Sequence, residues 1–218
     1  MCTNKKVNTY CISQYEIYNC KLLFYIKLIT NIAYRNMQYV ICKVMAQVKN
    51  NLKSQDIVIL LKIIAMGEEN WFHHTLAQEL GMSQSEVTQS LNRSKYAGLI
   101  DNARKKVNRI ALTEFILHGL SYAFPQQPGA LVRGVLTAHS AEPLNKLIHS
   151  SEKYVWPYAK GIDRGQAIEP MYNTVVEASL KDRDLYELLA LVDALRVGKV
   201  REKELAKKEL QKRILNEQ

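Results

Sequence analysis

The chain has 218 residues, of which 47% are apolar and 23% charged, with a formal net charge of +9 and a sequence pI near 9.3. This composition is typical of a globular protein and excludes a wholly disordered chain. No run of about 18 consecutive apolar residues is present, so we expect no membrane-spanning helix, and a cytoplasmic location. An excess of positive charge indicates a polyanionic partner where it is concentrated on one surface.

Residues 1–44 are an atypical N-terminal extension. They hold all four cysteines, whereas all nine glycines and all five prolines follow them. They are rich in residues with A/T-rich codons, such as Lys, Asn, Ile and Tyr. Two interpretations stay open. The first is a genuine helical extension. The second, which we favour, is a translated upstream region, with the true start at Met37 or Met45. The cysteines lack CxxC spacing and a nearby histidine cluster, so we expect neither metal binding nor cytoplasmic disulfides.

Residues 45–124 are predicted to form a helix-turn-helix domain. A first helix is expected over 54–66, with Ser54 as its N-cap, an apolar stripe on one face and Gly67 at its end. Two shorter helices then meet across a tight turn, where Gly81 is expected in the left-handed conformation. Ser83 and Glu86 form a Ser-x-x-Glu capping box that begins the second of them. The inward positions of the pair hold apolar residues, namely Leu76, Leu80, Val87 and Leu91.

The outer face of the helix that starts near Ser83 carries short hydrogen-bonding side chains followed by cations. Side chains of the first kind read base edges in a DNA groove, and cations contact phosphates. The expected base-reading residues are Ser83, Gln84, Ser85, Thr88, Gln89 and Asn92. The expected phosphate contacts are Arg93, Lys95, Arg104, Lys105, Lys106 and Arg109, in a segment with a single carboxylate at Asp101.

The stretch 76–87, continued by Leu91 and by Ala-Gly-Leu at 97–99, resembles the helix-turn-helix of bacterial MarR-like winged-helix transcriptional regulators. The resemblance covers about residues 54–112. It implies a recognition helix in the major groove and a twofold dimer on a pseudo-palindromic site. Only residues 101–109 separate the recognition helix from the next apolar, helix-like run, so the wing of the family is expected to be short or absent.

The rest of the chain is expected to contain loops, short strands and helices. Residues 110–124 predict a helix that Pro125 ends. The region 125–173 is expected to be loop-rich with short β-hairpins, and it repeats an Arg-Gly pair at Arg133 and Arg164. These arginines could contact the anionic groups of a ligand or partner. The alternative, which we favour, is that they pair with local carboxylates. Residues 174–218 predict helices that lie on the body or form a dimer.

The sequence therefore predicts a mainly α-helical, cytoplasmic transcriptional regulator that binds double-stranded DNA as a homodimer. The alternative is an antitoxin or adaptor that holds a partner protein through residues 125–169 and autoregulates its operon. The sequence contains no glycine-rich phosphate loop, nucleophile elbow, paired-carboxylate motif or metal-ligand spacing. We therefore expect no enzymatic activity, no metal and no cofactor.

Overall fold

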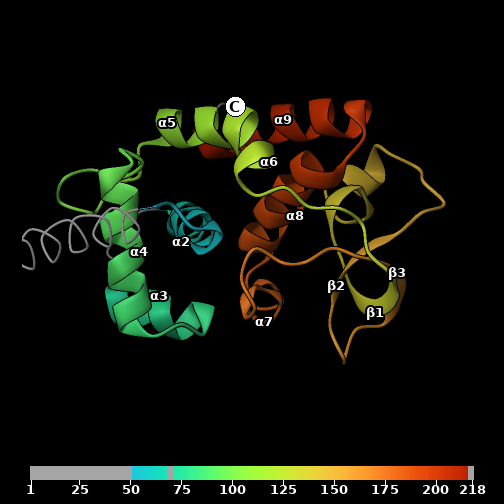
Figure 1. Cartoon of the computed structure of the whole chain (residues 1–218), viewed down its shortest axis with the longest axis horizontal. Helices are drawn as coiled ribbons and strands as arrows, with labels where there is room; N and C mark the ends of the chain where they lie inside the picture. The colour runs from blue at the N-terminus through green and yellow to red at the C-terminus, as the bar shows by residue number, and fades with distance from the viewer. Residues whose placement is uncertain (1–50, 68–70, 216–218) are drawn as a thin grey trace, which may run out of the picture. The chain divides into compact units, whose positions relative to one another are not determined.

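The computed structural model describes residues 51–67 and 71–215, and the predictions made for residues 1–44 lie outside them. The described chain is mostly helical, with one small three-stranded mixed sheet, as Figure 1 shows. The mainly α-helical class is thus confirmed, whereas the short strands expected as β-hairpins form one mixed sheet. Within the described ranges, no helix has the length and apolar character needed to cross a membrane.

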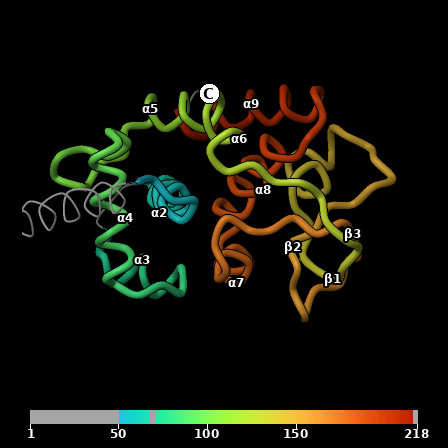
Figure 2. Tube along the Cα trace, viewed as in Figure 1, coloured from blue at the N-terminus to red at the C-terminus, as the bar shows by residue number. Residues whose placement is uncertain are grey.

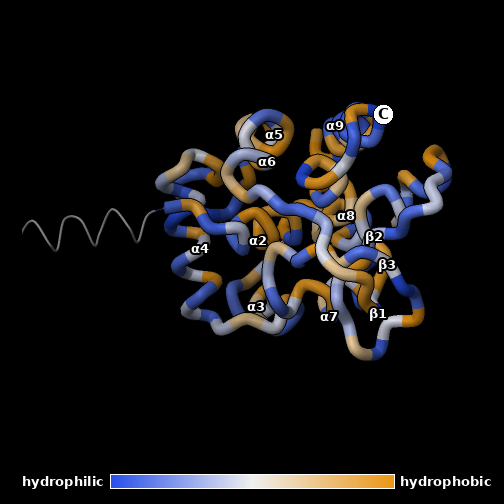
Figure 3. The backbone as a smooth tube through the Cα atoms, turned by 45° about the vertical axis from the view of Figure 1, so that its right-hand side comes forward, coloured by the Kyte–Doolittle hydropathy of each residue, from blue (hydrophilic) through white to orange (hydrophobic). Residues whose placement is uncertain are grey.

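The first three helices of the described chain pack against one another: α2 (Ser54–Ala65), α3 (His73–Leu80) and α4 (Gln84–Tyr96). Residues 57–61 of α2 are completely buried, because a helix that is apolar on all sides belongs in the middle of a fold. Figure 3 shows hydrophobic colouring at α2. Leu76, Leu80, Val87 and Leu91 are buried as the helical spacing predicted.

The N-cap of α2 is Lys53, and the prediction of Ser54 as the cap is wrong. The Asp56 carboxylate accepts the backbone N–H of Lys53 at 2.8 Å and satisfies one of the free donors of the first turn. The Ser54 hydroxyl instead donates to the carbonyl of Met171 at 2.7 Å. A long-range bond has replaced the local cap that the sequence suggested.

The remaining helices enclose α2 from the other side. A continuous helical segment follows α4 and consists of α5 (Arg109–Glu114), the π-helical turn η1 (Phe115–Gly119) and α6 (Leu120–Ala123). The chain ends with α7 (Val175–Ser179), α8 (Arg183–Val197) and α9 (Val200–Leu215). Helix α8 packs against α2, and α9 packs against α8 and α5 through Ala206, Leu210 and Ile214. A role of α9 in a dimer stays a prediction.

The sheet forms a small closed ring of three strands, β1 (Leu131–Leu136), β2 (Tyr154–Pro157) and β3 (Asp163–Ala167). Strand β1 is antiparallel to both of the others, with Val135 opposite Trp156 and Arg133 opposite Arg164. Strands β2 and β3 are parallel and close the ring. Figure 2 shows the three strands grouped together at the right of the view.

Glycines allow the backbones of this ring to approach one another closely. A Cβ atom on Gly134 would lie 1.9 Å from the carbonyl oxygen of Trp156, and one on Gly161 would lie 2.2 Å from the carbonyl oxygen of Gly134. A Cβ on Gly165 would lie 2.4 Å from the carbonyl oxygen of Lys153. Only a residue without a side chain fits at such positions, so these glycines are required for closure.

A buried carboxylate joins the sheet to α8. Asp193 accepts the indole N–H of Trp156 at 2.6 Å, the hydroxyl of Thr137 at 2.9 Å and an Arg196 N–H at 2.8 Å. Burial raises the pKa of Asp193, and Arg196 with the other donors opposes this shift. A buried carboxylate is tolerated only when its hydrogen bonds are satisfied, so this cluster specifies where the sheet lies on α8.

Replacing Gly134 by Ala is expected to destabilise the protein by at least about 3 kcal/mol, the upper end for an overfilled core. The matched control is Gly129→Ala, because a Cβ there would meet Ala167 at an ordinary 3.5 Å. We expect the control to change the free energy of unfolding by less than about 0.5 kcal/mol. Urea unfolding of both variants measures the difference, and equal stabilities would contradict the close strand crossing.

Candidate nucleic-acid interface

Helices α3 and α4 meet across a turn whose geometry follows from local sequence signals. Gly81 has φ 63° and ψ 35°, the left-handed conformation predicted for it, and Met82 N–H returns to the carbonyl of Ala77 at 2.9 Å. The Ser83 hydroxyl accepts Glu86 N–H at 3.2 Å, and the Glu86 carboxylate accepts Ser83 N–H at 3.0 Å. The predicted capping box is thus confirmed.

Contacts from the segment before α7 also support this turn, and no local sequence pattern predicts them. The hydroxyl of Thr174 donates to the carbonyl of Leu80, and the hydroxyl of Tyr172 donates to Glu86 at 3.1 Å. Backbone and side-chain bonds from Ser83, followed by the bond from Tyr172, lower the pKa of Glu86. The cap therefore stays ionised at neutral pH, where a negative charge suits a helix N-terminus.

Helix α4 has one buried face and one polar, exposed face. Val87, Ser90, Leu91 and Ser94 are buried against α2 and α3. The opposite side exposes uncharged hydrogen-bonding groups and a lysine, namely Gln84, Ser85, Gln89, Asn92 and Lys95. Ser83, at the cap, is exposed as well. These are residues that we predicted to contact DNA, and the structure brings them together on one surface.

Neighbouring groups hold several of these polar side chains in place. The amide of Gln89 donates to the hydroxyl of Ser85 at 3.2 Å. Thr88 is half-buried, its hydroxyl donates to the carbonyl of Gln84 at 2.8 Å, and it lies 3.2 Å from His73 Nδ1. Thr88 is therefore less available for a base contact than the sequence suggested.

Arg93 is not on the exposed face, and its prediction as a phosphate contact is corrected here. Its guanidinium donates to both carboxylate oxygens of Asp56, from Nε at 2.8 Å and from Nη2 at 2.5 Å. The two side chains are 4% and 0% exposed. A bidentate pair of this kind has a defined geometry, so it sets the angle at which α4 crosses the start of α2. The lone carboxylate at the head of an apolar helix was the signal for a buried cation.

Arg109 is also directed into the protein. It is the first residue of α5, it is half-buried, and its Nη1 donates to the carbonyl of Ile214 at 2.5 Å. A cation at the last turn of a helix can donate to a free carbonyl and interacts favourably with the negative end of the helix dipole. Its prediction as a phosphate contact is therefore corrected as well: Arg109 holds the end of α9.

A short β-ribbon follows α4 where the sequence predicted a short or absent wing. Ile100 and Val107 form one antiparallel bridge, and Asp101 N–H bonds to the carbonyl of Lys106 at 2.9 Å. The carboxylate of Asp101 accepts the N–H groups of Lys105 and Lys106 at 2.6 and 3.0 Å. Partial burial raises the pKa of Asp101, but these hydrogen bonds outweigh it, so the pKa is lowered overall.

This ribbon is fixed beside α4. Arg104 Nη1 donates to the side-chain oxygen of Asn92 at 2.8 Å, and the indole N–H of Trp71 donates to the carbonyl of Lys105 at 3.2 Å. Lys105 and Lys106 are exposed, and neither forms an ion pair with a carboxylate of the described residues, although the charge of Lys106 helps to lower the pKa of Asp101. The polar face of α4 thus has two exposed lysines at its border, with Arg104 linking the two elements.

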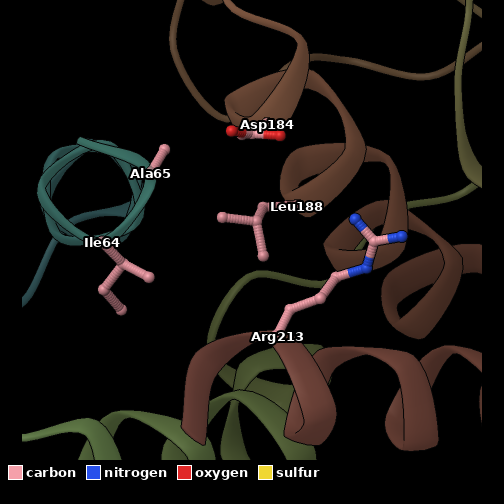
Figure 4. A pocket seen from close by; sticks show the side chains of 5 residues that line it. All are labelled: Ile64, Ala65, Asp184, Leu188 and Arg213. Carbon is pink, nitrogen blue, oxygen red and sulfur yellow. The ribbon is translucent and has the colours of Figure 1, made fainter. Parts of the chain in front are cut away.

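The described residues contain no group of three or more His, Cys, Asp or Glu side chains that could hold a metal ion. A cavity of about 220 Å³ lies between α2, α8 and α9, lined by Ile64, Ala65, Asp184, Leu188 and Arg213 (Figure 4). It is smaller than most ligand sites, and Arg213 is paired with Glu187 at 2.5 Å. We assign no ligand to it.

The ion pair between Asp56 and Arg93 leads to a stability prediction with a matched control on the same helix. Arg93→Ala leaves a buried carboxylate without its cation and is expected to cost about 3–5 kcal/mol. Lys95→Ala removes an exposed cation two residues further on and is expected to cost less than about 0.5 kcal/mol. Urea denaturation measures both. Equal effects would mean that Arg93 is not part of a buried pair.

No protein-family model, curated protein or solved structure matches this chain. The function therefore rests on the geometry of the α3–α4 surface and on the resemblance of residues 76–87 stated above.

Proposed function

We propose that α3 and α4 form a helix-turn-helix and that the chain is a transcriptional regulator that binds double-stranded DNA. The observation that carries this proposal is the exposed row of Gln84, Ser85, Gln89 and Asn92 on a helix whose other side is sealed into an apolar core. Such a helix fits the major groove with its polar side towards the base edges.

The chemistry of this row suits base recognition. A Gln or Asn side chain offers a donor and an acceptor in one plane and can bind the N6 and N7 positions of adenine together. Gln89 is restrained by Ser85, and Asn92 is restrained by Arg104, so both amides are partly ordered before DNA arrives. Ordering of this kind lowers the entropy cost of binding.

The cations that remain exposed are suited to the phosphates at the edges of the groove. Lys95 lies on the last turn of α4, and Lys105 and Lys106 lie on the adjacent ribbon. Arg104 donates a hydrogen bond to Asn92. A contact between Arg104 and a phosphate would break this bond, which connects the ribbon to α4. The proposed phosphate contacts are therefore Lys95, Lys105 and Lys106, without Arg93 and Arg109.

A selection of bound sequences from a pool of random duplexes tests this function. The full chain is expected to enrich a motif of defined length, and a homodimer would enrich two related half-sites about one helical turn apart. If the recovered sequences match the starting pool, or if the chain does not retain duplexes at low salt, the proposed function is wrong.

Gln89→Ala is expected to relax the preference for one base pair of the selected site by about 1–3 kcal/mol, because it removes one bidentate contact. Fluorescence anisotropy on the selected site and its single-base variants measures the change. Gln127→Ala removes an exposed Gln in the loop after α6 and is the control. A uniform loss at all positions of the site would contradict a base-reading role.

Replacing Lys105 and Lys106 together by Ala is expected to weaken binding to all sequences equally. The slope of log affinity against log salt should fall by about 0.9 for each phosphate contact that is lost. Lys203→Ala with Lys208→Ala removes two lysines of α9 and provides a control of equal charge. An unchanged slope in the first variant would show that the ribbon does not contact DNA.

A further inference from the structure

The sheet carries two arginines that face each other on neighbouring strands. Arg133 of β1 lies directly opposite Arg164 of β3 in the antiparallel register. Residues opposite each other in this way point to the same side of a sheet. Both side chains are exposed, and among the described residues neither has a hydrogen bond or an ion pair. The carboxylates close by have other partners, since Asp163 binds Lys153 at 2.9 Å and Glu152 lies 3.6 Å from Lys199.

The favoured expectation that local carboxylates neutralise these arginines is therefore wrong. Like charges directly opposite each other destabilise a sheet. The antiparallel pairing of residues 131–134 with residues 163–166 keeps the two arginines opposite each other. The fold thus places two arginines directly opposite each other, at a cost that an anionic partner would remove. Guanidinium groups favour carboxylates through paired hydrogen bonds.

Large apolar side chains border this pair. Leu131 is two residues before Arg133 and is 77% exposed, and Ile162 is two residues before Arg164 and is 95% exposed. A hollow of about 260 Å³ opens beside Arg164, with Leu131, Lys153 and Gln166 in its wall. Exposed aliphatic groups next to cations do not match a nucleic-acid backbone. They match a protein segment that brings acidic and apolar side chains together.

This surface lies on the side of the molecule away from α4. Helix α4 packs on α2, α2 packs on α8, and α8 with its neighbouring turn η2 (Ala138–Ser140) supports the sheet. Figures 1 and 2 show this order of elements within the unit 51–215. A duplex bound along α4 would therefore leave the two arginines free for another molecule.

We propose that Leu131, Arg133, Ile162 and Arg164, here named the arginine face, bind an acidic segment of a partner protein. Two carboxylates of that segment meet Arg133 and Arg164, and apolar side chains on either side of these carboxylates pack on Leu131 and on Ile162. This interaction does not require the DNA-binding role of α4.

Selection from a displayed library of random peptides on the full chain tests the arginine face. We expect enriched peptides that contain at least a pair of Asp or Glu residues next to Leu, Ile or an aromatic residue. Arg133→Ala with Arg164→Ala should weaken the best peptide at least about tenfold, because each arginine supplies charge-assisted hydrogen bonds. The control is Arg201→Ala with Lys208→Ala, which removes two exposed cations of α9 and should leave binding unchanged.

A charge reversal separates binding from folding. Arg164→Glu places opposite charges across β1 and β3, so the midpoint of thermal unfolding should rise while the acidic peptide no longer binds. The DNA affinity of all these variants should equal that of the native chain. Peptides without acidic enrichment, equal binding by the double alanine variant, or a loss of DNA affinity in place of peptide affinity would each overturn the proposal.

Discussion

The placement of α4 depends on the buried ion pair between Asp56 and Arg93. The carboxylate of Asp56 accepts the N–H of Lys53 and both donors of Arg93, so one group sets where α2 begins and how α4 crosses it. A buried charge without its partner is costly, and arrangements of the two helices that separate this pair are therefore disfavoured. The exposed row on α4 follows from this constraint, because the ribbon and the polar residues are positioned by the face that Arg93 turns inward.

Two other buried charges connect distant segments in the same way. Asp193 joins α8 to the sheet through Thr137 and Trp156. Lys62 of α2 reaches Glu79 of α3 at 2.5 Å and Asp182, the N-cap of α8, at 2.6 Å. Burial opposes the charge on Lys62, but bonds from the two carboxylates raise its pKa above the usual value. Each charge is satisfied only when elements far apart in the sequence have met, which adds specificity to a largely apolar core.

Local signals predicted the α3–α4 turn, and long-range partners decided what was missed. Gly81 and the capping box of Ser83 and Glu86 depend on neighbours within five residues, so their conformation can be read from the chain. Arg93 and Arg109 have partners in α2 and α9, and a sequence reading based on local charge placed both on the surface. Short strands were expected in the region 125–173, but their closure into a ring depends on backbone approaches at glycines, which no periodic pattern reports.

Two groups of exposed cations in the described chain lie on different kinds of surface. Charge along the sequence suggested one basic region at 93–109, yet Arg93 and Arg109 are used inside the fold, and Lys95, Lys105 and Lys106 stay exposed next to uncharged amides. Arg133 and Arg164 are exposed next to aliphatic groups. A polyanion with regular phosphates suits the first neighbourhood, and a mixed acidic and apolar peptide suits the second. Positive charge alone therefore does not identify a partner; the side chains that surround each cation do.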